Sequence, residues 1–453
     1  MKKVNIIGAG LAGSEAAYQI AEAGIPVVLY EMKPDKYSPA HKIPYFAELV
    51  CSNSLRSNLL ENAVGVLKQE LRYQNSLIIA VADKHQIPAG GALAVDRTEF
   101  SRTITNIINE HPLITVEHKE VKDLAKFDLE NEYVLIASGP LTSDNLYKSL
   151  KNFLGEDLYF FDAVAPIIEY ESIDHSRTFK ASRYGKGIGE YINCPFNKEQ
   201  YELFYQALLA AKTVPINELD EFNLFQGCMP IEEIARQGPN TLLFGPLKPI
   251  GLNDPTTGKE PYAVVQLRQD NQAATLYNLV GFQTRLTWSE QKRVFRMIPG
   301  LENAIFERFG VMHRNIYYNS PNNLKLGYQH KTINNLFFAG QITGVEGYVE
   351  SVGSGLVAAK TLIRDYFSIQ DENTTYLNPE TILGGLAHYV TSAESKYFQP
   401  MNANFGLVPA LTATERNQLK QKYNISEKGR RGRRLVYARR ALSHYPQFHL
   451  NIS

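Results

Sequence analysis

The chain opens on an alternation of short apolar runs and a glycine-rich turn. Val4–Ile7 is an apolar run of strand type, residues 8–13 contain three glycines, and Ser14–Ala23 is an alanine-rich stretch with helical spacing. After a glycine and a proline, Val27–Tyr30 is a second apolar run typical of a buried strand. Strand, helix and strand in this order predict a βαβ unit, and such units build parallel sheets with helices on both faces.

Two later segments repeat the buried-strand pattern. Tyr133–Ala137 is apolar and ends at a Ser-Gly-Pro breaker, and Asn335–Ala339 is followed by the glycine-rich connection 340–347 and by helical spacing over Glu350–Ile363. Between them, in residues 156–325, aromatic residues alternate with polar ones and Pro and Gly separate short β-like runs. The pattern predicts an α/β fold: a Rossmann-like, doubly wound parallel sheet formed by both ends of the chain, with an inserted α+β domain.

Composition is that of a globular protein with a sizeable core. The 453 residues are 44% hydrophobic and 21% charged, and the length is typical of two or three domains. Lys plus Arg and Asp plus Glu number 47 each, so only a local patch could attract a polyanion. The three cysteines are too few for a disulfide framework, and no run approaches the roughly 18 apolar residues of a membrane span. We expect a cytoplasmic protein without a membrane segment.

The first turn carries a dinucleotide-binding motif. Gly8 permits the tight turn, Gly10 lets the backbone approach a pyrophosphate, and Gly13 lets the helix pack closely on the strand. Glu31 closes the second strand 21 residues after Gly10, where a carboxylate accepts hydrogen bonds from an adenosine ribose. The predicted cofactor contacts are Gly8, Ala9, Gly10, Leu11, Ala12, Gly13 and Glu31.

A second glycine-rich segment favours FAD over NAD. The predicted contacts in it are Gly340, Gln341, Gly344, Gly347 and Tyr348. The helix that follows offers free N–H groups at its start, and the reduced anion of a flavin is favoured near a helix N-terminus. No second motif of the N-terminal kind follows a suitable strand, so a nicotinamide donor would bind without a Rossmann domain of its own. We therefore predict FAD as the resident cofactor.

Several long segments resemble one family of RNA-modifying flavoproteins. Besides the N-terminal motif with its acidic residue, they are Leu49–Ser57, Phe225–Glu232, Tyr262–Asn278 and Phe338–Ser351. These segments resemble the folate- and FAD-dependent RNA uridine-5-methyltransferases, the TrmFO family, over nearly the whole chain to about Pro409. The resemblance implies reductive methylation of uridine at carbon 5, to 5-methyluridine in the T loop of tRNA. It also implies methylenetetrahydrofolate as the one-carbon donor and NAD(P)H as the reductant.

Such a methyl transfer needs a reactive thiol. Carbon 5 of uracil is a poor nucleophile until a thiolate adds to carbon 6, and a base must then remove the carbon 5 proton. Cys228 precedes Pro230 and two acidic residues, a helix-start pattern, and a helix N-terminus favours a thiolate. Cys51 lies in a polar segment, and the resemblance implies that both cysteines are functional. We predict that Cys228 attacks the base and Cys51 assists near the flavin, whereas Cys194 is a packing residue.

Other candidates are weaker. Seven polar residues in family-like segments could contact flavin, folate or RNA: Arg97, Lys248, Arg268, Asn271, Arg285, His313 and Arg314. The ten histidines have no metal-ligand spacing, so we expect no metal. Residues 428–440 gather seven basic residues in thirteen, with Tyr437 able to stack on a base. That segment either binds RNA or is a solvated basic surface.

These predictions divide the chain into four parts. They are the first part of the FAD-binding domain (1–155), the insertion domain for substrate or RNA (156–325), the second part of the FAD-binding domain (326–410) and a basic C-terminal extension (411–453). Three other functions stay open: the same chemistry on ribosomal RNA, a flavin thiol or amine oxidoreductase using Cys51 and Cys228, and a non-catalytic FAD-containing partner of an RNA modification enzyme. The active-site motifs do not separate the two RNA classes.

Overall fold

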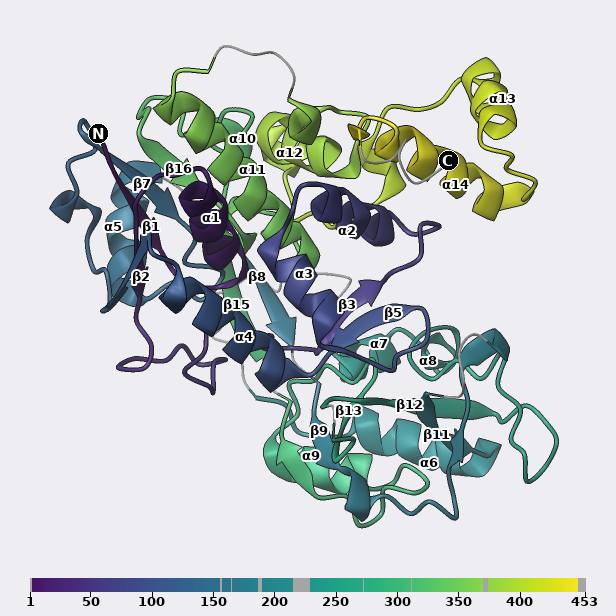
Figure 1. The fold of residues 1–453 in the computed structure, drawn as a ribbon. Helices are drawn as coiled ribbons and strands as arrows, with labels where there is room; N and C mark the ends of the chain where they lie inside the picture. The colour runs from purple at the N-terminus through teal and green to yellow at the C-terminus, as the bar shows by residue number, and fades with distance from the viewer. Residues whose placement is uncertain are drawn as a thin grey trace.

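A five-stranded parallel sheet forms the centre of the larger part of the molecule (Figure 1). The computed structural model describes residues 2–154, 157–163, 165–185, 190–214, 229–271, 273–310, 312–369 and 374–446. The strand order is β16-β7-β1-β2-β6. The strands are β1 (Lys3–Ile7), β2 (Val27–Glu31), β6 (Ile114–His118), β7 (Glu132–Ile136) and β16 (Leu336–Phe338). Because β16 pairs with β7 in parallel, the chain returns to its N-terminal sheet, and the predicted α/β class is confirmed.

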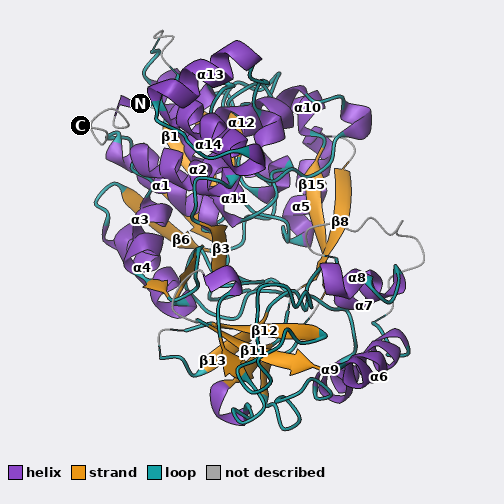
Figure 2. Ribbon diagram, turned by 90° about the vertical axis from the view of Figure 1, so that its right-hand side faces the viewer, coloured by secondary structure: helices purple, strands orange, loops and turns teal. Residues whose placement is uncertain are grey.

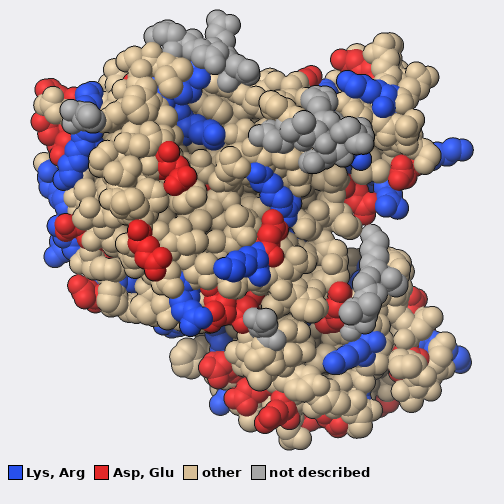
Figure 3. Space-filling model, in the orientation of Figure 1, with Lys and Arg blue, Asp and Glu red and all other residues tan. Residues whose placement is uncertain are grey.

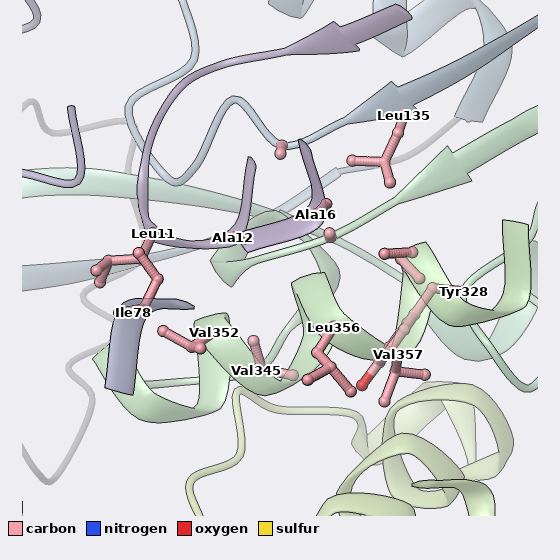
Figure 4. Packing of buried hydrophobic residues seen from close by; sticks show 14 of the residues in the cluster. Leu11, Ala12, Ala16, Ile78, Leu135, Tyr328, Val345, Val352, Leu356 and Val357 are labelled. Carbon is pink, nitrogen blue, oxygen red and sulfur yellow. The ribbon is translucent and has the colours of Figure 1, made fainter. Parts of the chain in front are cut away.

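Two helices from opposite ends of the chain pack against each other beside this sheet. They are α1 (Leu11–Glu22) and α11 (Tyr348–Tyr366). Figure 4 shows apolar side chains of both helices in one buried cluster. A Cβ atom on Gly355 of α11 would lie 2.4 Å from the carbonyl oxygen of Ala12, so a glycine is needed for this close approach. Both helices begin two or three residues before the predicted starts, because glycines rather than polar side chains precede them.

The middle of the chain folds around a separate six-stranded antiparallel sheet, here called the insert (Figure 2). Its strands are β9 (Ile167–Glu169), β10 (Phe179–Lys180), β11 (Tyr191–Phe196), β12 (Ala263–Gln269), β13 (Leu276–Leu279) and β14 (Phe306–Arg308). Its helices are α6 (Lys198–Leu209), α7 (Ile231–Arg236), α8 (Thr241–Phe244) and α9 (Trp288–Phe295). The insert has its own apolar core, built from residues between 165 and 304.

Smaller elements connect the parallel sheet with the insert and cover the parallel sheet. The antiparallel pair β8 (Asp157–Ala163) and β15 (Met312–Tyr318) runs from the parallel-sheet domain toward the insert in Figure 2. A three-stranded sheet contains β3 (Ser54–Ser57), β4 (Gln86–Ile87) and β5 (Ala92–Val95). The remaining helices are α2 (Ala63–Tyr73), α3 (Leu77–Lys84), α4 (Arg97–Glu110), α5 (Asp144–Leu154), α10 (Ser320–Asn323), α12 (Ile382–Ser392), α13 (Ala413–Lys422) and α14 (Gly429–Leu442). The three boundaries between the four predicted parts of the chain stay predictions.

Within the described ranges, no helix combines the length and the apolar character needed to cross a membrane.

Candidate active site

A cavity opens at the carboxyl ends of the parallel strands, where doubly wound sheets bind their ligands. Both ends of the chain line it: Gly8–Ala12 and Glu31 from the first βαβ unit, and Gly340, Gln341 and Tyr348 from the second glycine-rich segment. The turn Ser138–Ser143 also lines the cavity, although we did not predict it as a site. The sequence feature that could have predicted this turn as part of the site is the Ser-Gly-Pro breaker after a buried strand, because parallel strands end at the same edge of the sheet.

The three glycines of the first motif have three different roles. Gly8 adopts a φ of +101°, and a Cβ there would lie 2.6 Å from the carbonyl oxygen of Ala137. A Cβ on Gly13 would lie 1.8 Å from the carbonyl oxygen of Gly8, so Gly13 serves close packing. A Cβ on Gly10 would meet nothing within 4 Å, and Gly10 lines the cavity. Gly10 therefore leaves room for a ligand, while Gly8 and Gly13 shape the turn.

The carboxylate of Glu31 holds the same turn. It is 7% exposed at the end of β2. One oxygen accepts a hydrogen bond from the backbone N–H of Ala9 (2.9 Å), and the other accepts one from the N–H of Lys33 (3.0 Å). An ionised carboxylate can accept about four hydrogen bonds, so both oxygens retain capacity for ribose hydroxyls.

The second glycine-rich segment brings the start of α11 to the cavity. Gly340, Gly344 and Gly347 have φ values of +82°, +88° and +112°, which favour glycine. Gly340 lies on the cavity wall, whereas Gly344 and Gly347 set the path of the backbone to Tyr348. Gly347 caps α11 without a side-chain hydrogen bond, so the first N–H groups of the helix remain available to a ligand.

Tyr348 connects the cavity wall to Cys51. Its hydroxyl accepts hydrogen bonds from the backbone N–H groups of Cys51 (2.7 Å) and Ser52 (3.2 Å), and it donates to the Cys51 Sγ (3.0 Å). Burial, followed by the electrostatic interaction with Cys51, raises the pKa of Tyr348 well above its usual value of 10. The phenol therefore stays protonated at neutral pH and remains a donor to the sulfur.

Two arginines fix the Cys51 segment against the insert. Arg268 of β12 is buried and donates from Nε to the Asn53 side-chain oxygen (3.1 Å) and from a terminal nitrogen to Ser52 Oγ (2.6 Å). Arg97, at the start of α4, pairs with Asp270 of the insert (2.8 Å). The cysteine segment is thus positioned by contacts between the parallel-sheet domain and the insert.

The other predicted residues lie away from this centre or outside the described residues. Arg285 pairs with Glu233 within the insert (2.6 Å). Cys194 is fully buried in the insert core, where burial raises the pKa of its thiol, as expected for a packing residue. The helix predicted after Pro230 is present as α7. Cys228 and the side chains of His313 and Arg314 lie outside the described residues.

We expect Tyr348→Phe to slow alkylation of Cys51 several-fold. The variant removes the O–H donor at 3.0 Å, and a thiolate that loses a hydrogen bond is less populated and attacks an alkylating agent more slowly. The measurement is the rate of iodoacetamide labelling at Cys51 by peptide mass spectrometry at pH 7.5. Tyr389→Phe is the matched control, because its hydroxyl donates to the carbonyl of Gln399. An unchanged labelling rate at Cys51 would show that the phenol has no influence on the thiol.

Comparisons with known proteins agree with this geometry. A family model described as glucose inhibited division protein A matches residues 3–368. An Enterococcus faecalis protein named methylenetetrahydrofolate--tRNA-(uracil-5-)-methyltransferase TrmFO is 57% identical over 423 residues, 93% of this chain and 95% of that protein. A protein of the same name from Shouchella clausii is 53% identical over 448 residues, 99% of this chain and 98% of that protein.

A solved structure shares the fold. Aquifex aeolicus GidA matches with a TM-score of 0.65 at 13% identity, over 99% of this chain and 87% of that chain. The sequence matches extend over almost the full length of the named relatives. The chain therefore belongs to the glucose inhibited division protein A family and, within it, to the TrmFO family.

Proposed function

We propose that this protein methylates uridine at carbon 5 in tRNA, using FAD, methylenetetrahydrofolate and NAD(P)H. The observation that carries the proposal is the contact of Tyr348 with Cys51, because Tyr348 also lines the cavity of the dinucleotide motif. A thiol is thereby held beside a site suited to a flavin. The relatives named above support the choice of tRNA as the substrate.

The residues of the cavity fit FAD. The open space over Gly10 suits a pyrophosphate, and the Glu31 carboxylate suits a ribose. Gly340, Gln341 and the start of α11 would hold the flavin end of the molecule. When bound, FAD supplies the electrons that reduce a transferred one-carbon unit to a methyl group.

The protein's own residues would prepare the thiol and the base. The Tyr348 hydroxyl makes two hydrogen bonds with Cys51 and one with Ser52, and Arg268 binds the side chains of Ser52 and Asn53. We assign Cys51 to proton removal near the flavin and Cys228 to addition at carbon 6 of uridine. The cytoplasmic location stays a prediction.

The decisive experiment is an assay on RNA from cells that lack 5-methyluridine. The protein is incubated with that RNA, NADPH and methylenetetrahydrofolate whose methylene carbon carries deuterium, and nucleosides are analysed by mass spectrometry. The expected product is deuterated 5-methyluridine in the tRNA fraction, and omission of folate or reductant should abolish it. Label found only in ribosomal RNA would reassign the substrate. NADPH oxidation without any labelled nucleoside would refute the methyl transfer.

Arg268→Gln is expected to lower the methylation kcat by about tenfold without loss of FAD. The variant removes the hydrogen bonds that fix Ser52 and Asn53, so the Cys51 segment becomes less ordered, and small displacements of catalytic groups are costly. The measurements are kcat and flavin absorbance. Arg296→Gln is the control, since that guanidinium bonds only to the carbonyl of Ala304 among the described residues. A wild-type kcat in Arg268→Gln would exclude this positioning role.

A further inference from the structure

The basic C-terminal segment is a docked helical hairpin. In the second half of α14, Val436, Ala438, Ala441 and Leu442 are almost completely buried, and the last three belong to the core of the parallel-sheet domain. Arg440 is also buried, and it donates to the carbonyl of Pro409 (2.6 Å). A solvated basic tail is therefore excluded for this half, and removing it would expose the core.

The first half of α14 has the opposite character. Lys428, Arg430, Arg431 and Arg433 are all exposed. Residues 412–442, here called the C-terminal hairpin, contain ten basic and two acidic residues, whereas the whole chain is neutral. Figure 3 shows Lys and Arg atoms projecting at the corner where Figure 1 draws α13 and α14, above an indentation that separates this corner from the insert. Positive charge is thus concentrated at one corner of a neutral protein.

The other helix of the hairpin lacks an apolar face. α13 has no buried residue, and Thr412 and Glu415 form a capping box at its start. Arg416, Lys420 and Lys422 add to the positive charge of the hairpin. A surface helix normally buries an apolar stripe, and a helix that is polar all round has no packing reason for its place. Binding to a negatively charged partner would explain the position of α13.

We propose that the C-terminal hairpin is a docking surface for the phosphate backbone of the RNA substrate. This inference rests on the proposed function, in which the substrate is RNA. A helix with several exposed guanidinium groups binds phosphates through charge-assisted hydrogen bonds and release of counterions. The contact would not depend on base sequence, because phosphates are the same at every position. The hairpin would therefore contribute affinity and orientation rather than choice of the uridine.

The hairpin lies within reach of an RNA that is engaged at Cys51. Arg431 pairs with Glu61 (2.6 Å). Glu61 follows Cys51 by ten residues, so Glu61 and Cys51 are at most about 36 Å apart, the length of an extended chain of ten residues. About ten stacked base pairs cover that distance. Arg56 of β3 lies between Cys51 and Glu61 in the sequence, and its side chain is 50% exposed. A folded RNA could thus contact the hairpin and Arg56 while its target base lies near Cys51.

The structure corrects one expectation for this segment. From the sequence, Tyr437 was a candidate for stacking on a base, but its ring packs against Phe405 (5.9 Å between centroids) and beneath the Arg440 guanidinium (5.3 Å). Its hydroxyl accepts a hydrogen bond from the N–H of Leu411 (3.2 Å). Tyr437 therefore holds the hairpin on the domain, and the docking surface acts through charge.

The test uses the FAD-loaded protein with Lys428, Arg430 and Arg433 all replaced by glutamine. Because these side chains are exposed and glutamine is a good helix former, the variant should fold as the wild type does. Affinity for tRNA without 5-methyluridine is measured by fluorescence anisotropy over a range of KCl concentrations. We expect roughly tenfold weaker binding at physiological salt and a salt slope lower by about two to three units. The KM for RNA should rise while kcat at saturating RNA stays unchanged.

Two further variants make the result specific. The first variant, with Lys428→Arg, Arg430→Lys and Arg433→Lys, keeps the charge and should keep the wild-type salt slope. The second variant changes Lys3, Lys122 and Lys148 to glutamine, which removes the same charge from exposed positions in β1, in the segment after β6 and in α5. In Figure 1, β1 and α5 lie on the opposite side of the domain from α13 and α14. This variant should bind RNA as the wild type does. An unchanged slope and KM in the hairpin variant, with a wild type that binds and methylates RNA, would overturn the docking surface alone. A wild type that does not bind RNA would overturn the proposed function as well.

Discussion

Replacing Gly10 with valine is expected to leave the protein folded but with less than about a tenth of its FAD. Gly10 has φ −74° and ψ −168°, values open to any residue, and a Cβ there meets no protein atom within 4 Å. The added side chain instead occupies the space that the pyrophosphate needs. Flavin released by denaturation is quantified by absorbance, and the melting temperature of the apoprotein is compared with that of wild-type apoprotein.

A second glycine of the same motif provides the contrast. A Cβ on Gly13 would lie 1.8 Å from the carbonyl oxygen of Gly8, so Gly13→Ala should destabilise the fold itself, by about 3 kcal/mol or more. Gly10→Val should therefore lose FAD at an unchanged apoprotein melting temperature, and Gly13→Ala should lower that temperature. A full complement of FAD in Gly10→Val would contradict the assignment of this cavity.

Cys228 and Cys51, the two cysteines to which we assign catalytic roles, should differ when RNA containing 5-fluorouridine is supplied. Fluorine at carbon 5 cannot leave as a proton does, so the reaction stalls after thiolate addition and leaves a covalent complex of protein and RNA. Cys228→Ala is expected to abolish this complex and to reduce methylation by more than about 1000-fold, as for loss of a nucleophile. The complex is detected as a shifted band in a denaturing gel, and methylation by nucleoside mass spectrometry.

Cys51→Ala should impair methylation but retain FAD, because Val50 and Tyr348 line the cavity whereas the Cys51 side chain does not. Cys194→Ala is the control for removing a thiol, since Cys194 is buried in the insert core. Peptide mapping of the trapped complex identifies the attacking residue. RNA attached to Cys51 would reverse the two roles, and attachment to neither cysteine would refute the covalent mechanism.

The local parts of the site could be predicted because their signals are local. Gly8, Gly10 and Gly13 lie within six residues, and their roles depend on a turn between one strand and one helix. Strands β1, β2, β7 and β16 were also predicted, because each is a short buried apolar run. Strand β6 was not predicted, because only one of its residues is buried. The starts of α1 and α11 were predicted three and two residues late. Gly13 was assigned to the turn, although α1 begins directly after Gly10, and α11 begins directly after Gly347.

Contacts across the molecule were decided by the tertiary structure alone. Tyr348 was predicted to touch the cofactor, but its hydrogen bonds to Cys51 join residues 297 positions apart, and no local pattern encodes such a pair. Arg268 of β12 and Ser52, which precedes β3, are 216 positions apart. The basic segment shows the same division: its charge is a property of the sequence, whereas the burial of Arg440 and the exposure of Arg430 depend on how α14 packs. The sequence by itself therefore determined the fold class, the cofactor motif and the family, and the packing of distant segments decided which side chains meet.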